Sequence, residues 1–230
     1  MSNIEQRLQQ IEQNIQNACE RSGRTRSDIT VIAVTKEVST ERAIEVMNAG
    51  ILDLGENRTE GLLAKQESIQ KDAKWHFIGN VQSRKVRDLV NTIHCLHSLD
   101  RMSLAKEIQK RADQPIDCFV QVNVSGEETK SGVNPEELER FIEEIAAYDK
   151  IHVIGLMTMA PFTDDMEYIR TLFRQMKELR DKISVKQWEH APCTQLSMGM
   201  SNDYEIAIEE GATHVRIGTA LVGKESGETT

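Results

Sequence analysis

The stretch ITVIAVTKEVSTERAIEVMNAGILDL, residues 29–54, contains the repeating unit that decides the fold. Its first six residues form a short apolar run, which is typical of a buried strand. Residues 40–48 follow with helical spacing of apolar residues and stop before Gly50, and residues 51–54 begin another apolar run. Strand, helix and strand in this order predict a βαβ unit of a parallel sheet.

The same alternation continues through the chain, so that about eight strands are predicted, nearly all followed by a helix. The strands are expected near residues 29–34, 51–54, 75–78, 92–96, 116–124, 152–157, 194–197 and 214–217. Helices are expected at residues 40–48, 59–69, 83–90, 101–111, 135–147, 164–183 and 203–209. This repeat predicts an α/β protein with a single (β/α)8 TIM barrel, and an open doubly wound sheet is the alternative.

An extra helix precedes the barrel, because apolar residues fall every three or four positions between residues 4 and 18. We expect residues 1–22 to pack on the barrel. A dimerising coiled coil is the alternative, but the stripe is too short to argue for one. No linker divides the remainder, so residues 1–230 are interpreted as one domain with a frayed tail at residues 224–230.

Composition limits the function. The chain has 230 residues and a net charge of −9, so no positive field attracts nucleic acid or an anionic membrane. No apolar run approaches the roughly 20 residues of a membrane span, and the polar start is unlike a signal peptide, which predicts a cytoplasmic protein. The four cysteines and six histidines show no metal-binding spacing, so no metal is expected. A closed barrel leaves no sheet edge, and a monomer is therefore the expected state.

Two cationic side chains are predicted to face the barrel mouth. If the first strand stays extended, Lys36 points the same way as Ile32 and Val34. A desolvated amine there is a nucleophile suited to a Schiff base with a carbonyl compound, whereas a lysine turned to solvent beside Glu37 is the alternative. In the last strand Arg216 alternates with apolar neighbours and faces inward, where it needs either a structural carboxylate or a ligand.

The loops after the seventh and eighth predicted strands are candidates for phosphate binding, because barrels often place a phosphate there. The first contains a glycine turn and leads into a helix, where Ser201, Asn202 or Asp203 could equally be an N-cap. Together the two loops offer Ser197, Met200, Ser201, Gly218 and Thr219.

Other strand ends add polar side chains to the same rim. These candidates are Asn57, Arg58, His76, Asn80, Gln121 and Asn123, with Met157 and Met159 from the sixth strand. Strand-end polarity alone also explains each of them. The loop of residues 125–132 is expected to be either a plain turn or a lid with Lys130 at its tip.

Taken together, several short segments resemble the pyridoxal phosphate homeostasis protein family of the YggS/PROSC type, which is related to the alanine racemase N-terminal domain. The segments are AVTK at 33–36, GENR at 55–58, HFIGN at 76–80, VNVSG at 122–126, GLM at 155–157, LSMGMS at 196–201 and VRIGT at 215–219. They occur in the family's order and span nearly the whole chain.

The resemblance implies that pyridoxal 5′-phosphate (PLP) is held as an internal aldimine on Lys36. It assigns Ser201, the Met200 amide, Gly218 and Thr219 to the phosphate and Arg216 to the pyridine nitrogen. Asn57 and His76 match further family positions that line the pocket. Ser197 is added to the predicted cofactor-binding residues from its place at the start of the loop after the seventh strand.

The resemblance also implies a carrier without catalytic residues, which buffers or delivers the cofactor, with PLP-dependent apo-enzymes as possible partners. An arginine at the pyridine nitrogen disfavours the pyridinium that makes PLP a strong electron sink. A weak racemase using His76 or Cys193 as the second base is an alternative. Without the resemblance, Lys36 would also fit a Schiff-base phosphosugar aldolase.

Overall fold

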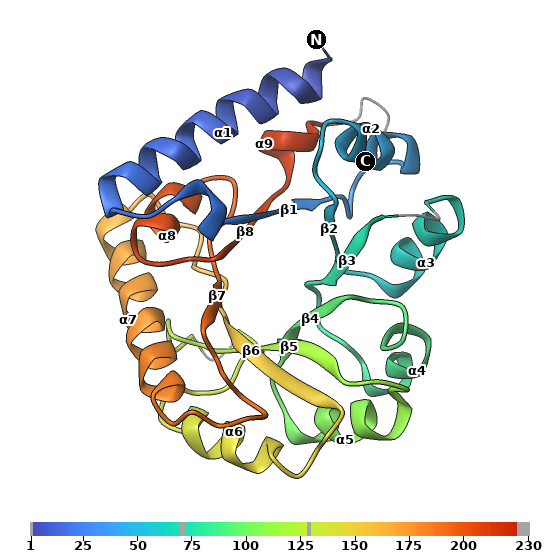
Figure 1. Ribbon diagram of the computed structural model, residues 1–230, viewed down its shortest axis with the longest axis vertical. Helices are drawn as coiled ribbons and strands as arrows, with labels where there is room; N and C mark the ends of the chain where they lie inside the picture. Colours follow the sequence, from blue (N-terminus) through green and yellow to red (C-terminus); the bar gives the residue numbers. More distant parts are fainter. Residues whose placement is uncertain (1, 70–71, 128–129, 225–230) are drawn as a thin grey trace.

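The computed structural model describes residues 2–69, 72–127 and 130–224. Within them eight parallel strands close into a barrel in sequence order, which confirms the predicted (β/α)8 TIM barrel (Figure 1). The strands are β1 (Thr30–Val34), β2 (Asp53–Glu56), β3 (Lys74–Phe77), β4 (Cys95–Leu99), β5 (Ile116–Gln121), β6 (Ile151–Met157), β7 (Gln195–Ser197) and β8 (His214–Ile217).

Helices cover the outside of this barrel (Figure 1). They are α1 (Asn3–Ser22), α2 (Thr40–Asn48), α3 (Thr59–Ser68), α4 (Val86–Leu89), α5 (Met102–Arg111), α6 (Leu138–Ile145), α7 (Met166–Ser184), α8 (Tyr204–Glu209) and α9 (Thr219–Val222), with 3₁₀ turns η1 (Arg26–Asp28) and η2 (Ser83–Lys85). The four-residue α9 was not predicted. No helix within the described ranges is long and apolar enough to cross a membrane. The expected fraying of the tail concerns residues that, apart from Lys224, lie outside the described ranges.

The fourth strand was placed three residues too early by the sequence pattern. Thr92 belongs to the turn that follows α4, because both its amide and its hydroxyl donate to the carbonyl of Leu89. The strand therefore starts only at Cys95. As a result His97 lies in the middle of β4, rather than at its end, and points into a fully buried environment.

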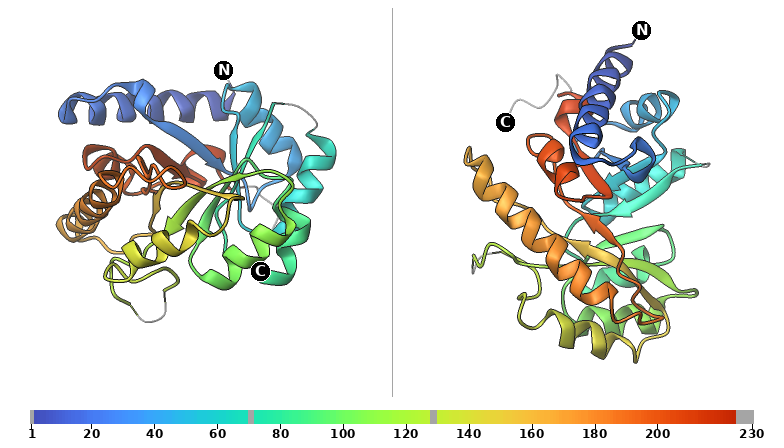
Figure 2. Two further views of the ribbon diagram at one scale, coloured as in Figure 1. Left: turned by 60° about the horizontal axis from the view of Figure 1, so that its bottom comes forward. Right: turned by 60° about the vertical axis from the view of Figure 1, so that its left-hand side comes forward.

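Helix α1 packs along the outside of the barrel against α8 and α9 (Figure 2). Ser2 and Glu5 form a capping box at its start, and Gly23 ends it with a φ of 68°. Its apolar stripe is buried, with Ile4 and Ile15 fully inaccessible, and Asn14 donates to the hydroxyl of Tyr204 at 2.9 Å. The stripe is thus covered by this chain's own helices.

We expect Ile15→Val to lower the free energy of unfolding by about 0.5–1.5 kcal/mol, because it removes one buried methylene from this contact. Urea denaturation measures the change. Ile44→Val, at a side chain that is 38% exposed, is the matched control and should cost much less. If Ile15→Val lowered the free energy of unfolding as little as Ile44→Val does, the contact of α1 with the barrel would contribute little to stability.

Candidate functional site

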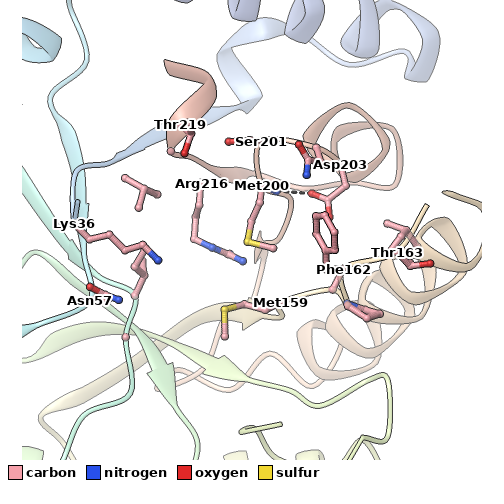
Figure 3. Close-up of a pocket in the computed structure, with 18 of the residues that line it drawn as sticks. Lys36, Asn57, Met159, Phe162, Thr163, Met200, Ser201, Asp203, Arg216 and Thr219 are labelled. Carbon is pink, nitrogen blue, oxygen red and sulfur yellow. Dashed lines mark hydrogen bonds between the residues drawn. The ribbon is translucent and has the colours of Figure 1, made fainter. Parts of the chain in front are cut away.

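A cavity of about 640 Å³ opens at the carboxyl ends of the strands. This is the end at which TIM barrels carry their functional residues. Of the residues predicted to bind the cofactor, those that line it are Lys36, Asn57, Met200, Ser201, Arg216, Gly218 and Thr219, and Figure 3 shows most of them around one space. The structure thus brings together seven of the nine residues predicted to bind the cofactor, and the rim candidates Asn80 and Met159 line the same cavity.

Lys36 lies in a turn two residues beyond the end of β1 and extends into the cavity (Figure 3). Its side chain is 38% exposed, and its Nζ lies 3.7 Å from Oε1 of Glu37. The sequence left open whether Lys36 faces the barrel mouth or turns to solvent beside Glu37. The structure has features of both, since the amine lines the pocket and also lies near Glu37. An accessible amine in this position is able to meet an aldehyde.

A buried polar cluster lies beneath the turn that carries Lys36. Lys65 of α3 donates to the Glu56 carboxylate and to the Thr35 carbonyl, both at 2.8 Å, and the Thr35 hydroxyl donates to Glu56 at 2.6 Å. All three residues are almost fully buried. Sequence reasoning missed this cluster, although Lys65 stands three residues after buried Leu62 on the same helix face.

Arg216 is 3% exposed and faces the cavity from β8. One amino group donates to the Ser197 hydroxyl at 2.6 Å and the other to the Thr158 carbonyl at 2.8 Å. Burial lowers the pKa of Arg216 to about 10, against an opposing effect of the Asp203 charge. Within the described residues both hydrogen bonds of this guanidinium go to neutral oxygens and none to a carboxylate, which favours the ligand interpretation over a structural ion pair.

The loop after β7 bends sharply at Gly199, which has a φ of 95°. A Cβ there would lie 2.6 Å from Cβ of Ala207, so the loop approaches α8 closely. The Met200 amide donates to the Asp203 carboxylate at 2.5 Å. Burial raises the pKa of Asp203, with that hydrogen bond and Arg216 opposing the rise. Asp203 thus occupies the amide that the resemblance assigns to a phosphate.

The hydroxyls of Ser201 and Thr219 lie on the same side of the cavity (Figure 3). Gly79 brings the loop after β3 against Asn57, because a Cβ at Gly79 would lie 2.2 Å from the Asn57 carbonyl oxygen. The loop after β6 adds Met159 and Phe162, and Phe162 is 95% exposed. Sequence reasoning missed Phe162, for which Pro161 in a strand-end loop was the only available signal.

Two predicted residues lie elsewhere. Ser197 is fully buried behind Arg216, and His76 points toward the amino ends of the strands, where it lines a second cavity of about 370 Å³. Its two ring nitrogens contact His97 and Asp53. The rim candidates Gln121 and Asn123 are bonded to the backbone of the loop after β5. Lys130 forms an ion pair with Glu127 in that loop.

All four cysteines are free and buried. Burial raises the pKa of Cys193 to about 12, which makes its thiol a poor base near neutral pH. One group of side chains within the described residues has metal-ligand geometry, since the ligand atoms of His76, Cys95 and His97 lie within 4.8 Å of one another.

Comparisons with known proteins identify the relatives. The family described as alanine racemase, N-terminal domain, matches residues 6–226. A pyridoxal phosphate homeostasis protein from Aquifex aeolicus is 44% identical over 223 residues, which cover 95% of this chain and 97% of that protein.

Solved structures agree with these matches. PipY of Synechococcus elongatus, in a structure with PLP bound, superposes with a TM-score of 0.81 at 28% identity, over 91% of this chain and 100% of PipY. An alanine racemase from Clostridium difficile gives a TM-score of 0.76 at 18% identity, over 99% of this chain but 58% of the racemase. The likeness to the racemase supports the barrel fold alone.

Proposed function

The chain belongs to the pyridoxal phosphate homeostasis proteins, and on this premise we propose that it binds PLP and buffers or delivers it inside the cell. The observation that carries the proposal is one pocket that holds an accessible amine, Lys36, and a buried guanidinium, Arg216. Such donors suit an anionic ligand that carries an aldehyde.

The residues around the pocket have separable roles in this proposal. Lys36 would offer its amine to the aldehyde group, with loss of water. Ser201, Thr219 and backbone amides near Met200 and Gly218 hold the phosphate, for which Asp203 must release or share the Met200 amide. Arg216 donates toward the pyridine nitrogen, and Asn57 completes the wall.

The same groups argue for a carrier rather than a catalyst. Bound PLP supplies an electron sink for carbanion chemistry, and a donor at its ring nitrogen weakens that sink. Neither base suggested for a weak racemase reaches the pocket, because His76 lies at the other end of the barrel and Cys193 is buried outside the lining. The relatives' name as homeostasis proteins is consistent with this proposal.

We expect the purified protein to take up about one equivalent of PLP and to show little turnover of amino acids. Titration followed by visible absorption gives the stoichiometry, and chiral analysis of alanine incubated with the loaded protein gives the rate. Racemisation on the order of 1 s⁻¹ or faster would contradict a carrier role. Failure to take up PLP would contradict the ligand itself.

A further inference from the structure

A polar chain crosses the interior of the barrel from the second cavity to Arg216. Nε2 of His76 lies 2.9 Å from Oδ1 of Asp53, and Nδ1 of His76 lies 2.9 Å from Nε2 of His97. Nδ1 of His97 lies 2.8 Å from the Ser197 hydroxyl, which accepts from Arg216. We call Asp53, His76, His97 and Ser197 the interior chain.

The donor and acceptor of every hydrogen bond in the interior chain follow from the groups at its two ends, Arg216 and Asp53. A guanidinium only donates, so the Ser197 oxygen accepts from Arg216 and its own proton is free for His97. A neutral His97 then carries its proton on Nε2 and donates to Nδ1 of His76. His76 in turn carries its proton on Nε2 and donates to the carboxylate of Asp53. An ionised carboxylate has no proton to donate and can only accept.

The opposite direction leaves unfavourable contacts. If His97 carried its proton on Nδ1, His76 would have to donate from Nδ1, and a neutral His76 would turn a bare Nε2 toward the Asp53 carboxylate. Two acceptors would then face each other at 2.9 Å.

Burial and charge support the neutral, ordered form of the interior chain. His97 is fully buried, and this burial, together with the positive charge of Arg216, holds its pKa well below the usual value. Burial tends to raise the pKa of Asp53, but the hydrogen bond with His76 and the nearby charge of Lys74 oppose it, and the net pKa is lowered. An ionised Asp53 therefore terminates the interior chain. Hydrogen bonds in series polarise one another, so this charge strengthens the acceptor at Ser197.

We propose that the interior chain positions Arg216 and couples its donor groups to the charge of Asp53 at the opposite end of the barrel. Within the described residues the only other hydrogen bond of the Arg216 guanidinium goes to the Thr158 carbonyl, and no carboxylate pairs with it. His76 and Ser197 thus act on the pocket through Arg216 rather than by lining it. The effect on bound PLP rests on the proposed function, whereas the effect on Arg216 itself does not.

A metal ion on His76, Cys95 and His97 is the competing explanation of the same atoms. It would use Nδ1 of His76 and Nε2 of His97, which are hydrogen-bonded to each other in the interior chain. Burial also raises the pKa of Cys95 well above its usual value, which disfavours the thiolate that a metal needs.

The first test uses the ligand-free protein with ¹⁵N-labelled histidine and arginine. NMR should show that His97 carries its ring proton on Nε2 and that His76 donates from Nε2 to Asp53, and elemental analysis should show no stoichiometric metal. Asp53→Asn should shift the guanidinium resonances of Arg216, because the amide oxygen still accepts from His76 but the charge is gone. A proton on Nδ1 of His97, a bound metal, or an unchanged Arg216 would each overturn the proposal.

Asp117→Asn is the matched control, because Asp117 lines the same second cavity but is bonded to His152, outside the interior chain. In the PLP-loaded full chain, Asp53→Asn should weaken retention of PLP roughly 2- to 30-fold, the range of coupling between linked sites, and Asp117→Asn should leave it unchanged. Equal effects of the two variants would overturn the coupling. A wild-type protein that binds no PLP would instead overturn the proposed function and leave the NMR result to decide on the interior chain.

Discussion

Replacing Lys36 with alanine is expected to abolish covalent attachment of PLP while leaving the barrel folded. Lys36 is the amine that lines the pocket with Arg216, so its loss removes the group that we propose to bond to the aldehyde. Because the side chain is 38% exposed, the free energy of unfolding should change by only about 0.5 kcal/mol or less. Borohydride reduction followed by peptide mass analysis measures the attachment.

Lys85→Ala is the matched control for this experiment. Lys85 is 35% exposed and is also paired with a glutamate, Glu60, but it lies outside the main pocket. It should retain full attachment at Lys36. A pyridoxyl group on another lysine of the wild-type protein would contradict the assignment, and a sugar adduct at Lys36 would favour the phosphosugar aldolase.

Replacing Lys65 with methionine is expected to lower the free energy of unfolding by about 3–5 kcal/mol, the usual cost of leaving a buried charge without its partner. The Glu56 carboxylate is 1% exposed and would keep only the Thr35 hydroxyl as a donor within the cluster. The Thr35 carbonyl would lose its contact with Lys65 as well. Urea denaturation gives the midpoint and slope for each variant.

Two further variants distinguish the effect of breaking the buried Lys65–Glu56 pair from the effect of replacing any lysine. Lys85→Met removes an exposed partner of Glu60 and should cost about 1 kcal/mol or less. Adding Glu56→Gln to Lys65→Met should restore part of the lost stability, since it removes the uncompensated charge. Similar costs at Lys65 and Lys85, or no recovery in the double variant, would contradict a buried ion pair. Because Thr35 precedes Lys36, the single variant should also weaken PLP attachment.

The sequence predicted whether a strand residue points into or out of the barrel better than it predicted where the residue lies along the barrel axis. Alternation along the last strand correctly turned Arg216 inward. It does not say how high a side chain lies along the barrel axis. That height depends on the tilt and stagger of neighbouring strands, which are properties of the closed sheet. His76 therefore lies toward the second cavity, although it was predicted at the rim.

The contacts that support the site were harder to predict than the site itself. Lys36 and Thr219 stand beside strand ends, where a barrel places its functional residues. Their sequence positions were therefore sufficient to place them at the pocket. The buried cluster and the interior chain join residues such as Glu56, Lys65 and His97 from different elements. Such pairings require the register of the whole barrel, which no local pattern contains.

The pairing of β1 with β8, from Thr30 beside His214 to Ala33 beside Ile217, has a consequence for synthesis on the ribosome. Lys36 is synthesised before Arg216 and Thr219, and six further strands, β2 to β7, separate it from β8. Until β8 has formed, β1 and β7 present unpaired edges that invite association with other chains. A nascent chain that stops before β8 lacks Arg216, so the complete pocket can assemble only after translation has passed Thr219.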